Sequence, residues 1–217
     1  LSKGRHPLPD PSKFVASLAR VGIGKGKRVV AYDSGPGQNA ARLWWMMRWI
    51  GVNDAAILDG GIAKWTSEGR PLEPGERQAM PAAKRLEPMA RNDMFVDKRT
   101  VARAEELGLL LLDARSPERF RGEREPIDAV AGHIPGAVNA PWEENVTKSP
   151  IPVLRPHEVL RKHYEDLGVA DPSRVVCYCG SGVTACLDIL ALELAELRGA
   201  KLYVGSWSEW IATRQDS

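Results

Sequence analysis

The chain has 217 residues, 43% hydrophobic and 27% charged, a composition typical of a folded globular protein and unlike that of a disordered chain. Thirty basic against 28 acidic residues give a formal net charge of +2 without long runs of one sign, so we expect neither a nucleic-acid nor a membrane partner. No apolar stretch is long enough to span a bilayer, the first residues lack a signal-peptide pattern, and an odd number of cysteines fits a reducing compartment, so we expect a cytoplasmic protein.

The first elements along the chain read as a strand, a turn and a helix. Residues 27–33 form a short β-branched run, residues 34–37 are rich in Gly and Pro, and residues 39–50 have helical periodicity. Residues 171–197 repeat this order, with a strand at Val175–Tyr178, a glycine-containing loop from 179 to 182 and a helical pattern over 183–197. The sequence therefore predicts the same structural unit twice.

The repeat is supported by residue spacing. Asp33 matches Cys179, and the stretch from Leu58 to Trp65 matches the stretch from Tyr203 to Trp210. The period is near 146 residues. Because the first repeat has Asp where the second has Cys, only the second repeat is expected to carry out thiol chemistry.

The stretch 70–91, with four prolines and scattered charges, is typical of an interdomain linker. We expect a partial, inactive first domain at 1–76, a linker at 77–92 and a catalytic domain at 93–217. A buried strand at 109–113 opens the second unit, and the alternation of strands and helices predicts an α/β fold with mainly parallel sheets flanked by helices. The first unit has no counterpart of residues 109–141, so we expect it to be truncated at its N-terminus.

Cys179 is expected at the end of a strand and just before a helix. Backbone N–H groups and the helix dipole favour a negative charge at that position, so they favour the reactive thiolate. Gly180 and Gly182 allow the backbone to curl with its N–H groups inward, which forms a nest for a thiolate or a persulfide. A buried structural cysteine beside a glycine turn is the alternative that the loop alone leaves open.

The other two cysteines are expected to be packing residues. Cys177 precedes Cys179 by two positions on the strand, and Cys186 lies about two turns into the helix. Their spacing matches no usual zinc pattern and no fourth ligand lies nearby in the sequence, so we expect no metal site.

Four motifs, in the order of the family, resemble the rhodanese family: Asp113–Arg115 with Arg119–Gly122, Gly132–Asn139, Cys179–Thr184 and Gly205–Trp210. The first unit resembles the inactive partner domain of this family in Arg42–Met46 and Leu58–Gly61. The whole chain thus resembles a tandem-domain thiosulfate or 3-mercaptopyruvate sulfurtransferase without its beginning. The implied fold is two rhodanese-like domains, the first of them truncated.

The resemblance implies a reaction in which Cys179 takes sulfane sulfur from a small-molecule donor, holds it as a persulfide and passes it on. The implied acceptor is a thiol, such as thioredoxin or glutathione, or cyanide, and no cofactor is implied. Arg119 is implied to bind the anionic donor, because a guanidinium suits a carboxylate or a thiosulfonate; a solvated loop arginine is the alternative. The remaining loop residues implied to contact the donor are Gly180, Gly182, Val183 and Thr184.

Donor preference depends on the loop and on residues outside it. The neutral Ser181 resembles the mercaptopyruvate enzymes, whereas the thiosulfate enzymes carry a lysine there, so we expect mercaptopyruvate. Ser181 and His6 are expected to assist proton movement, with a mobile terminal histidine as the alternative. A second donor-binding arginine of the family aligns near Ile127, so it is missing unless Arg124 replaces it.

Two other functions compete with sulfur transfer. Cysteine phosphatases share the rhodanese fold but need an arginine in a loop that is one residue longer, and this loop ends in Thr184 and Ala185. A non-catalytic rhodanese-like binding or regulatory module is the alternative from a different class. The presence of Cys179 argues against it, because such modules tend to lose this cysteine.

Overall fold

The structure is a computed structural model that describes residues 3–75 and 84–212. It divides into two compact units, one of residues 8–92 and one of residues 1–7 together with 93–217. The N-terminal segment therefore differs from the sequence-based expectation, which placed residues 1–7 in the first domain. Its backbone explains why: the Arg5 N–H donates to Ser208 Oγ at 3.1 Å, in the C-terminal part of the chain.

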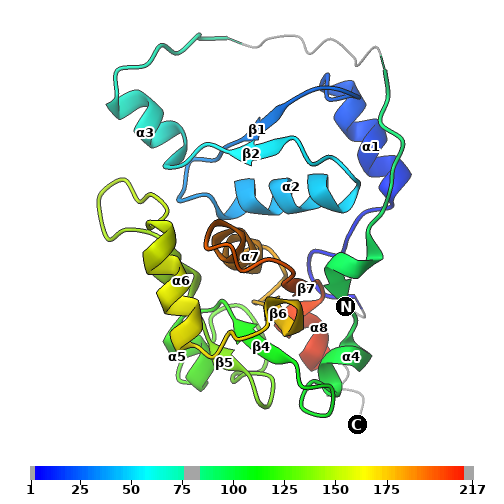
Figure 1. Ribbon diagram of the computed structural model, residues 1–217, viewed down its shortest axis with the longest axis vertical. Coiled ribbons are helices and arrows are strands. Elements are labelled where there is room, and N and C mark those ends of the chain that lie inside the picture. The colour runs from blue at the N-terminus through cyan, green and yellow to red at the C-terminus, as the bar shows by residue number, and fades with distance from the viewer. Residues whose placement is uncertain (1–2, 76–83, 213–217) are drawn as a thin grey trace. The chain divides into compact units, whose positions relative to one another are not determined.

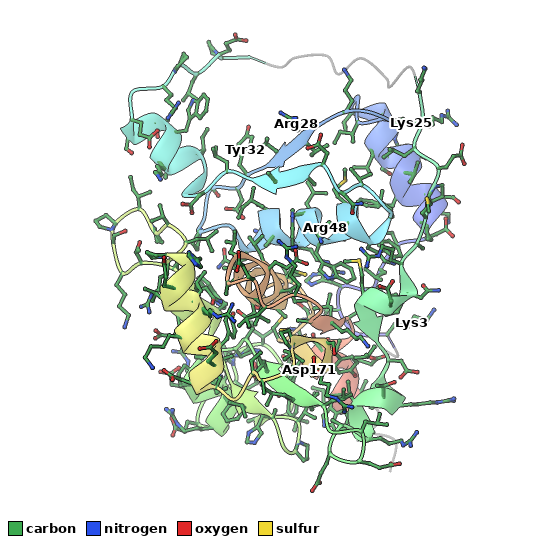
Figure 2. The ribbon with its side chains drawn as sticks, viewed as in Figure 1. Lys3, Lys25, Arg28, Tyr32, Arg48 and Asp171 are labelled. Carbon is green, nitrogen blue, oxygen red and sulfur yellow. The ribbon has the colours of Figure 1, made fainter. Side chains whose placement is uncertain are left out.

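Among its described residues, the unit of residues 8–92 contains one small parallel sheet and three helices. Strands β1 and β2 pair in parallel, and α2 packs on both of them (Figure 1). The elements, in chain order, are α1 (Pro11–Arg20), β1 (Val29–Ala31), α2 (Gln38–Trp49), β2 (Ala55–Ile57) and α3 (Gly61–Ser67). Figure 2 labels Tyr32, which follows β1 directly. This residue is 60% exposed.

The expected linker is in part a component of this unit. Its residues 77–83 lie outside the described residues, but 84–92 belong to the compact unit of 8–92. The Met89 N–H donates to the Ile50 carbonyl at 3.2 Å, and the Arg91 N–H donates to the Trp49 carbonyl at 2.8 Å. These bonds tie the segment to the end of α2.

The other unit is built on a parallel sheet of five strands in the order β3-β7-β6-β4-β5. Its strands are β3 (Phe95–Val96), β4 (Leu110–Asp113), β5 (Val138–Asn139), β6 (Val175–Tyr178) and β7 (Lys201–Tyr203). Its helices are α4 (Lys98–Ala102), α5 (Pro117–Arg121), α6 (His157–Asp166), α7 (Ala185–Leu194) and α8 (Ser206–Ala212). Short 3-10 turns lie at Asn92–Met94, Trp142–Asn145 and Pro172–Arg174.

Both faces of this sheet are covered, which explains the apolar run in its central strand. All four residues of β6 are buried. Val176 and Tyr178 pack into a cluster with Trp207 of α8, while α7 packs on β6 and β7, and α6 packs on α7. A parallel strand buried on both faces reads as a continuous hydrophobic run, as β4 and β6 do.

The architecture confirms the α/β class with parallel sheets flanked by helices. The order β1, α2, β2, α3 recurs as β6, α7, β7, α8, so the expected repeat is present in the structure. Among the described helices, none has both the length and the apolar composition needed to cross a membrane.

Candidate active site

Cys179 lies at the C-terminal end of the central strand β6, where the chain turns toward α7. Its side chain is almost fully enclosed, at 2% exposure. The backbone N–H of Gly182 donates to Cys179 Sγ at 3.1 Å. An N–H donor and the positive end of a ten-residue helix both stabilise negative charge on this sulfur. The arrangement is therefore suited to a thiolate or a persulfide.

The loop conformation depends on a glycine and on contacts from the turn before α8. Gly182 has φ +79°, a backbone conformation that favours glycine. Ser206 Oγ accepts from the Cys179 N–H at 3.2 Å and donates to the Tyr203 carbonyl at 2.9 Å. The Trp207 N–H donates to the Cys179 carbonyl at 2.9 Å, so β7 and α8 hold the backbone of the nucleophile.

Cys177 and Cys186 have other environments. Burial raises the pKa of the Cys177 thiol well above its usual value, and the nearby Asp188 and Cys186 add to the effect. Cys186 Sγ donates to the Gly182 carbonyl at 3.4 Å. All three cysteines are free of disulfides, and the described residues contain no group of three or more His, Cys, Asp or Glu side chains placed to hold a metal.

Arg119 lies on α5, held by two buried carboxylates. Glu125 accepts from its Nε at 3.1 Å and from its Nη2 at 2.7 Å, and Asp128 accepts from Nη2 at 3.1 Å. Glu125 also pairs with Arg115, at 3.3 Å, and Arg115 in turn pairs with Asp113, at 2.6 Å. Burial works to raise the pKa of Glu125, but the hydrogen bonds from Arg119 and from two backbone N–H groups outweigh it and lower that pKa.

A second guanidinium, that of Arg5, meets Arg119 beside the loop. A Cβ built on Gly180 would lie 2.8 Å from Arg5 Nη2 and 3.4 Å from Arg119 Nη2, so the glycine leaves room for both. Arg5 also forms an ion pair with Asp128. Arg124 is exposed, and the three atoms nearest to that Cβ belong to Arg5 and Arg119. Beside Gly180 the structure thus brings together Arg5 and Arg119, and the role of Arg124 stays a prediction.

His6 and Ser181 are adjacent, as the sequence suggested. His6 Nδ1 lies 2.9 Å from Ser181 Oγ, within hydrogen-bond distance. Ser181 is buried within the loop and His6 is exposed. The pair connects the loop of Cys179 to the surface, which is the arrangement needed for a proton relay.

The remaining loop positions begin helix α7. Val183 and Thr184 are partly buried, and their carbonyls accept from the N–H groups of Cys186 and Leu187 at 3.0 and 2.9 Å. They set the direction of the helix relative to Cys179. His133, outside this loop, stacks on Phe120 with ring centroids 3.9 Å apart.

A buried polar cluster lies on α7 next to this loop. Asp188 is fully buried and its Oδ1 accepts from Asn145 Nδ2 at 2.7 Å, while Oδ2 has no partner among the described residues. Burial, followed by the charge of the nearby Cys179, raises the pKa of Asp188 well above its usual value. Burial therefore favours the neutral form of the Asp188 carboxyl over the charged form.

In the other unit, the side chain of Asp33 accepts hydrogen bonds from the backbone of the matching loop. Asp33 Oδ1 accepts from the N–H groups of Gly35 and Gly37 at 3.0 and 3.1 Å. Its Oδ2 accepts from those of Asn39 and Ala40 at 3.0 and 3.1 Å. The backbone donors of this loop are thus already satisfied by a built-in anion.

Comparison with known proteins identifies the fold family. A family model described as the rhodanese-like domain matches residues 2–68 and 97–213. The chain belongs to the rhodanese-like family. Both matched segments contain one copy of the loop, the first with Asp33 and the second with Cys179.

Relatives in this family are enzymes named as sulfurtransferases. A probable 3-mercaptopyruvate sulfurtransferase of Pseudomonas aeruginosa is 45% identical over 211 residues, 96% of this chain and 73% of the relative. A putative thiosulfate sulfurtransferase, SseB, of Mycobacterium tuberculosis is 39% identical, over 96% of this chain and 72% of the relative. The structure of a 3-mercaptopyruvate sulfurtransferase from Leishmania major matches with a TM-score of 0.87 at 30% identity, over 98% of this chain and 59% of that one.

Three residues of the site escaped the sequence-based reasoning: Arg5, Asp128 and Ser206. Arg5 adjoins His6, for which a role was expected from the sequence, but no role was expected for Arg5 itself. Asp128 follows Ile127 directly, and its ion pairs with Arg5 and Arg119 leave no trace in the local sequence. For Ser206 the motif was recognised, while its contact with the Cys179 N–H is visible only in three dimensions.

Proposed function

We propose that the chain is a sulfurtransferase that moves sulfane sulfur from an anionic donor through a persulfide on Cys179 to a nucleophilic acceptor. The observation that carries this proposal is the enclosed sulfur of Cys179, within 3.1 Å of the Gly182 N–H, in a loop flanked by the guanidinium groups of Arg5 and Arg119. A nucleophile, an anion nest and two cations at one site are what this transfer requires.

In the first half of the reaction, the Cys179 thiolate attacks the sulfur of 3-mercaptopyruvate. The S–S bond forms as the C–S bond breaks, and the electron pair of the broken bond goes to carbon, giving the enolate of pyruvate. That enolate takes one proton to become pyruvate. With thiosulfate the same attack releases sulfite, which leaves as a stable anion and needs no proton.

The donor is held by its negative charge. Arg119 uses Nε and Nη2 on Glu125 and Asp128, which leaves Nη1 for the donor; Arg5 places Nη2 beside Gly180. Charged hydrogen bonds of this kind orient a carboxylate or a thiosulfonate toward the sulfur of Cys179. Gly182, Val183 and Thr184 would contact the donor through the loop backbone.

Ser181 and His6 would supply the proton that the enolate needs. Their contact of 2.9 Å allows a proton to move from the imidazole through the serine hydroxyl toward the loop. Because only the keto acid needs this proton, the pair favours 3-mercaptopyruvate over thiosulfate as the donor. This is the preference that the neutral Ser181 suggested.

In the second half, an acceptor attacks the outer sulfur of the persulfide and Cys179 leaves as the thiolate. A thiol such as thioredoxin or glutathione becomes a persulfide, and cyanide becomes thiocyanate. No cofactor takes part in these steps. Three free thiols in the chain agree with the proposed cytoplasmic location.

The test is mass spectrometry of the intact protein after incubation with 3-mercaptopyruvate or thiosulfate. We expect a mass gain of one sulfur atom that maps to Cys179 and disappears when cyanide is added. Cys179→Ser should abolish the gain, and Cys186→Ser, a matched change of a buried cysteine on α7, should preserve it. The absence of an adduct from either donor on the folded wild-type protein would favour a non-catalytic binding module.

A further inference from the structure

Asp128 connects the two guanidinium groups of the proposed donor site. Its Oδ2 accepts from Arg119 Nη2 at 3.1 Å, and its Oδ1 pairs with Arg5 Nη1. The Asp128 side chain is only 3% exposed, so this bridge is shielded from water. Its backbone N–H donates to Glu125 Oε1 at 3.1 Å, which fixes the position of Asp128 relative to the other carboxylate of the network.

The bridge lies next to the nucleophile. Arg5 and Arg119 meet beside Gly180, the residue that follows Cys179. Each guanidinium gives one nitrogen to Asp128. A second nitrogen of each lies near Gly180: from a Cβ built on this glycine, Arg5 Nη2 is at 2.8 Å and Arg119 Nη1 at 3.7 Å. Asp128 therefore sets the spacing of the two groups that face a donor.

The charges of this network balance. Three positive and three negative side chains are joined by the ion pairs: Arg5, Arg115, Arg119, Asp113, Glu125 and Asp128. Without Asp128 the site would carry one additional positive charge. A dianion gains about twice as much from an added positive charge as a monoanion does, because the Coulomb energy is proportional to the charge.

The geometry points to Asp128 as a positioning residue that also determines donor selectivity. This inference rests on the proposed sulfur transfer. It fixes the guanidinium groups of Arg5 and Arg119 relative to each other, and its negative charge favours the monoanionic keto acid over the thiosulfate dianion. Specificity arises here from a repulsive charge inside the binding site as much as from the attractive ones.

The experiment measures kcat/KM with 3-mercaptopyruvate and with thiosulfate for the wild type and for Asp128→Asn. We expect the ratio of thiosulfate to 3-mercaptopyruvate activity to rise about fivefold or more in Asp128→Asn, and the rise to shrink as salt is added. Asp128→Glu, which restores the charge, should move the ratio back toward that of the wild type. Glu123→Gln is the matched control, because Glu123 is a half-exposed carboxylate of the same loop, paired with Arg121, and its loss should leave the ratio unchanged.

An equal fall of both activities in folded Asp128→Asn would overturn the inference and assign Asp128 a purely structural role. If this variant does not fold, Arg5→Gln tests the same charge balance in the opposite direction: the thiosulfate ratio must fall, and an unchanged ratio overturns the inference. A wild type that turns over neither donor refutes the proposed function itself. A wild type that is active with both donors, but whose ratio none of the variants alters, refutes only the role of Asp128.

Discussion

Replacing Arg119 by Ala removes one of the two cations that face the donor. The Arg119 side chain is 17% exposed, so its hydrogen bond to a donor anion forms in a partly dehydrated site. A hydrogen bond to a charged group contributes about 1.5–3 kcal/mol. Because about 1.4 kcal/mol corresponds to a factor of ten, kcat/KM should fall about 10- to 150-fold.

The assay is the steady-state rate of pyruvate release from 3-mercaptopyruvate, with urea unfolding to confirm the fold of each variant. Because Glu125 keeps Arg115 and two backbone N–H groups as partners, we expect Arg119→Ala to remain folded. Arg119→Lys keeps the charge but loses the forked geometry, and it should recover only part of the activity. Arg121→Ala, at an exposed arginine of the same helix, is the matched control. A folded Arg119→Ala variant with less than a twofold change in kcat/KM would refute the placement of the donor.

Three other predictions concern separate parts of the molecule. His6→Gln should lower turnover of 3-mercaptopyruvate about 100-fold and leave thiosulfate turnover within about twofold, because only the enolate needs a proton; equal losses with both donors would contradict the relay. The free energy of unfolding of Asp188→Asn, relative to that of the wild type, should be higher at pH 8 than at pH 5, as measured by urea unfolding. The raised pKa of Asp188 means that the folded state retains a proton that the unfolded state loses above its ordinary pKa. The free energy of unfolding of the wild type therefore declines, by about 1.4 kcal/mol per pH unit, as pH rises from the unfolded-state pKa toward the folded-state pKa. An identical difference between variant and wild type at both pH values would contradict this. Asp33→Ala should destabilise the unit of residues 8–92 by about 1–2 kcal/mol, as the loss of a helix cap does, and faster hydrogen exchange at residues 35–40 would report it; persulfide formation on Cys179 should be unaffected.

The sequence predicted what depends on local pattern. The strand ending in Tyr178, the glycine loop and the following helix were found because a buried parallel strand, a turn and a helix each have a signature over a few residues. The repeat was visible because both copies keep the same spacing from Asp33 or Cys179 to a tryptophan. Family motifs then supplied the candidate roles of Cys179 and Arg119.

The rest depends on contacts between residues that are distant in the sequence. Arg5 and Asp128 are 123 positions apart, and nothing in either neighbourhood indicates their pairing. The grouping of residues 1–7 with residues 93–217 was not visible in the sequence for the same reason, and the role of Arg124 stays a prediction. Composition describes which residues are charged, whereas only the fold determines which of them meet.

The N-terminal segment has a consequence for how the site is assembled. Arg5 and His6 reach the unit of residues 93–217 while the chain between them and that unit folds as residues 8–92. A covalent connection of this kind keeps the two groups at a high effective concentration near Cys179, typically in the millimolar range for linked partners. Residues 93–217 expressed alone would retain the thiol and Arg119 but depend on added peptide for the other cation and the imidazole. In the proposed reaction, the chain of residues 8–92 would keep these two side chains covalently linked to the unit that carries Cys179.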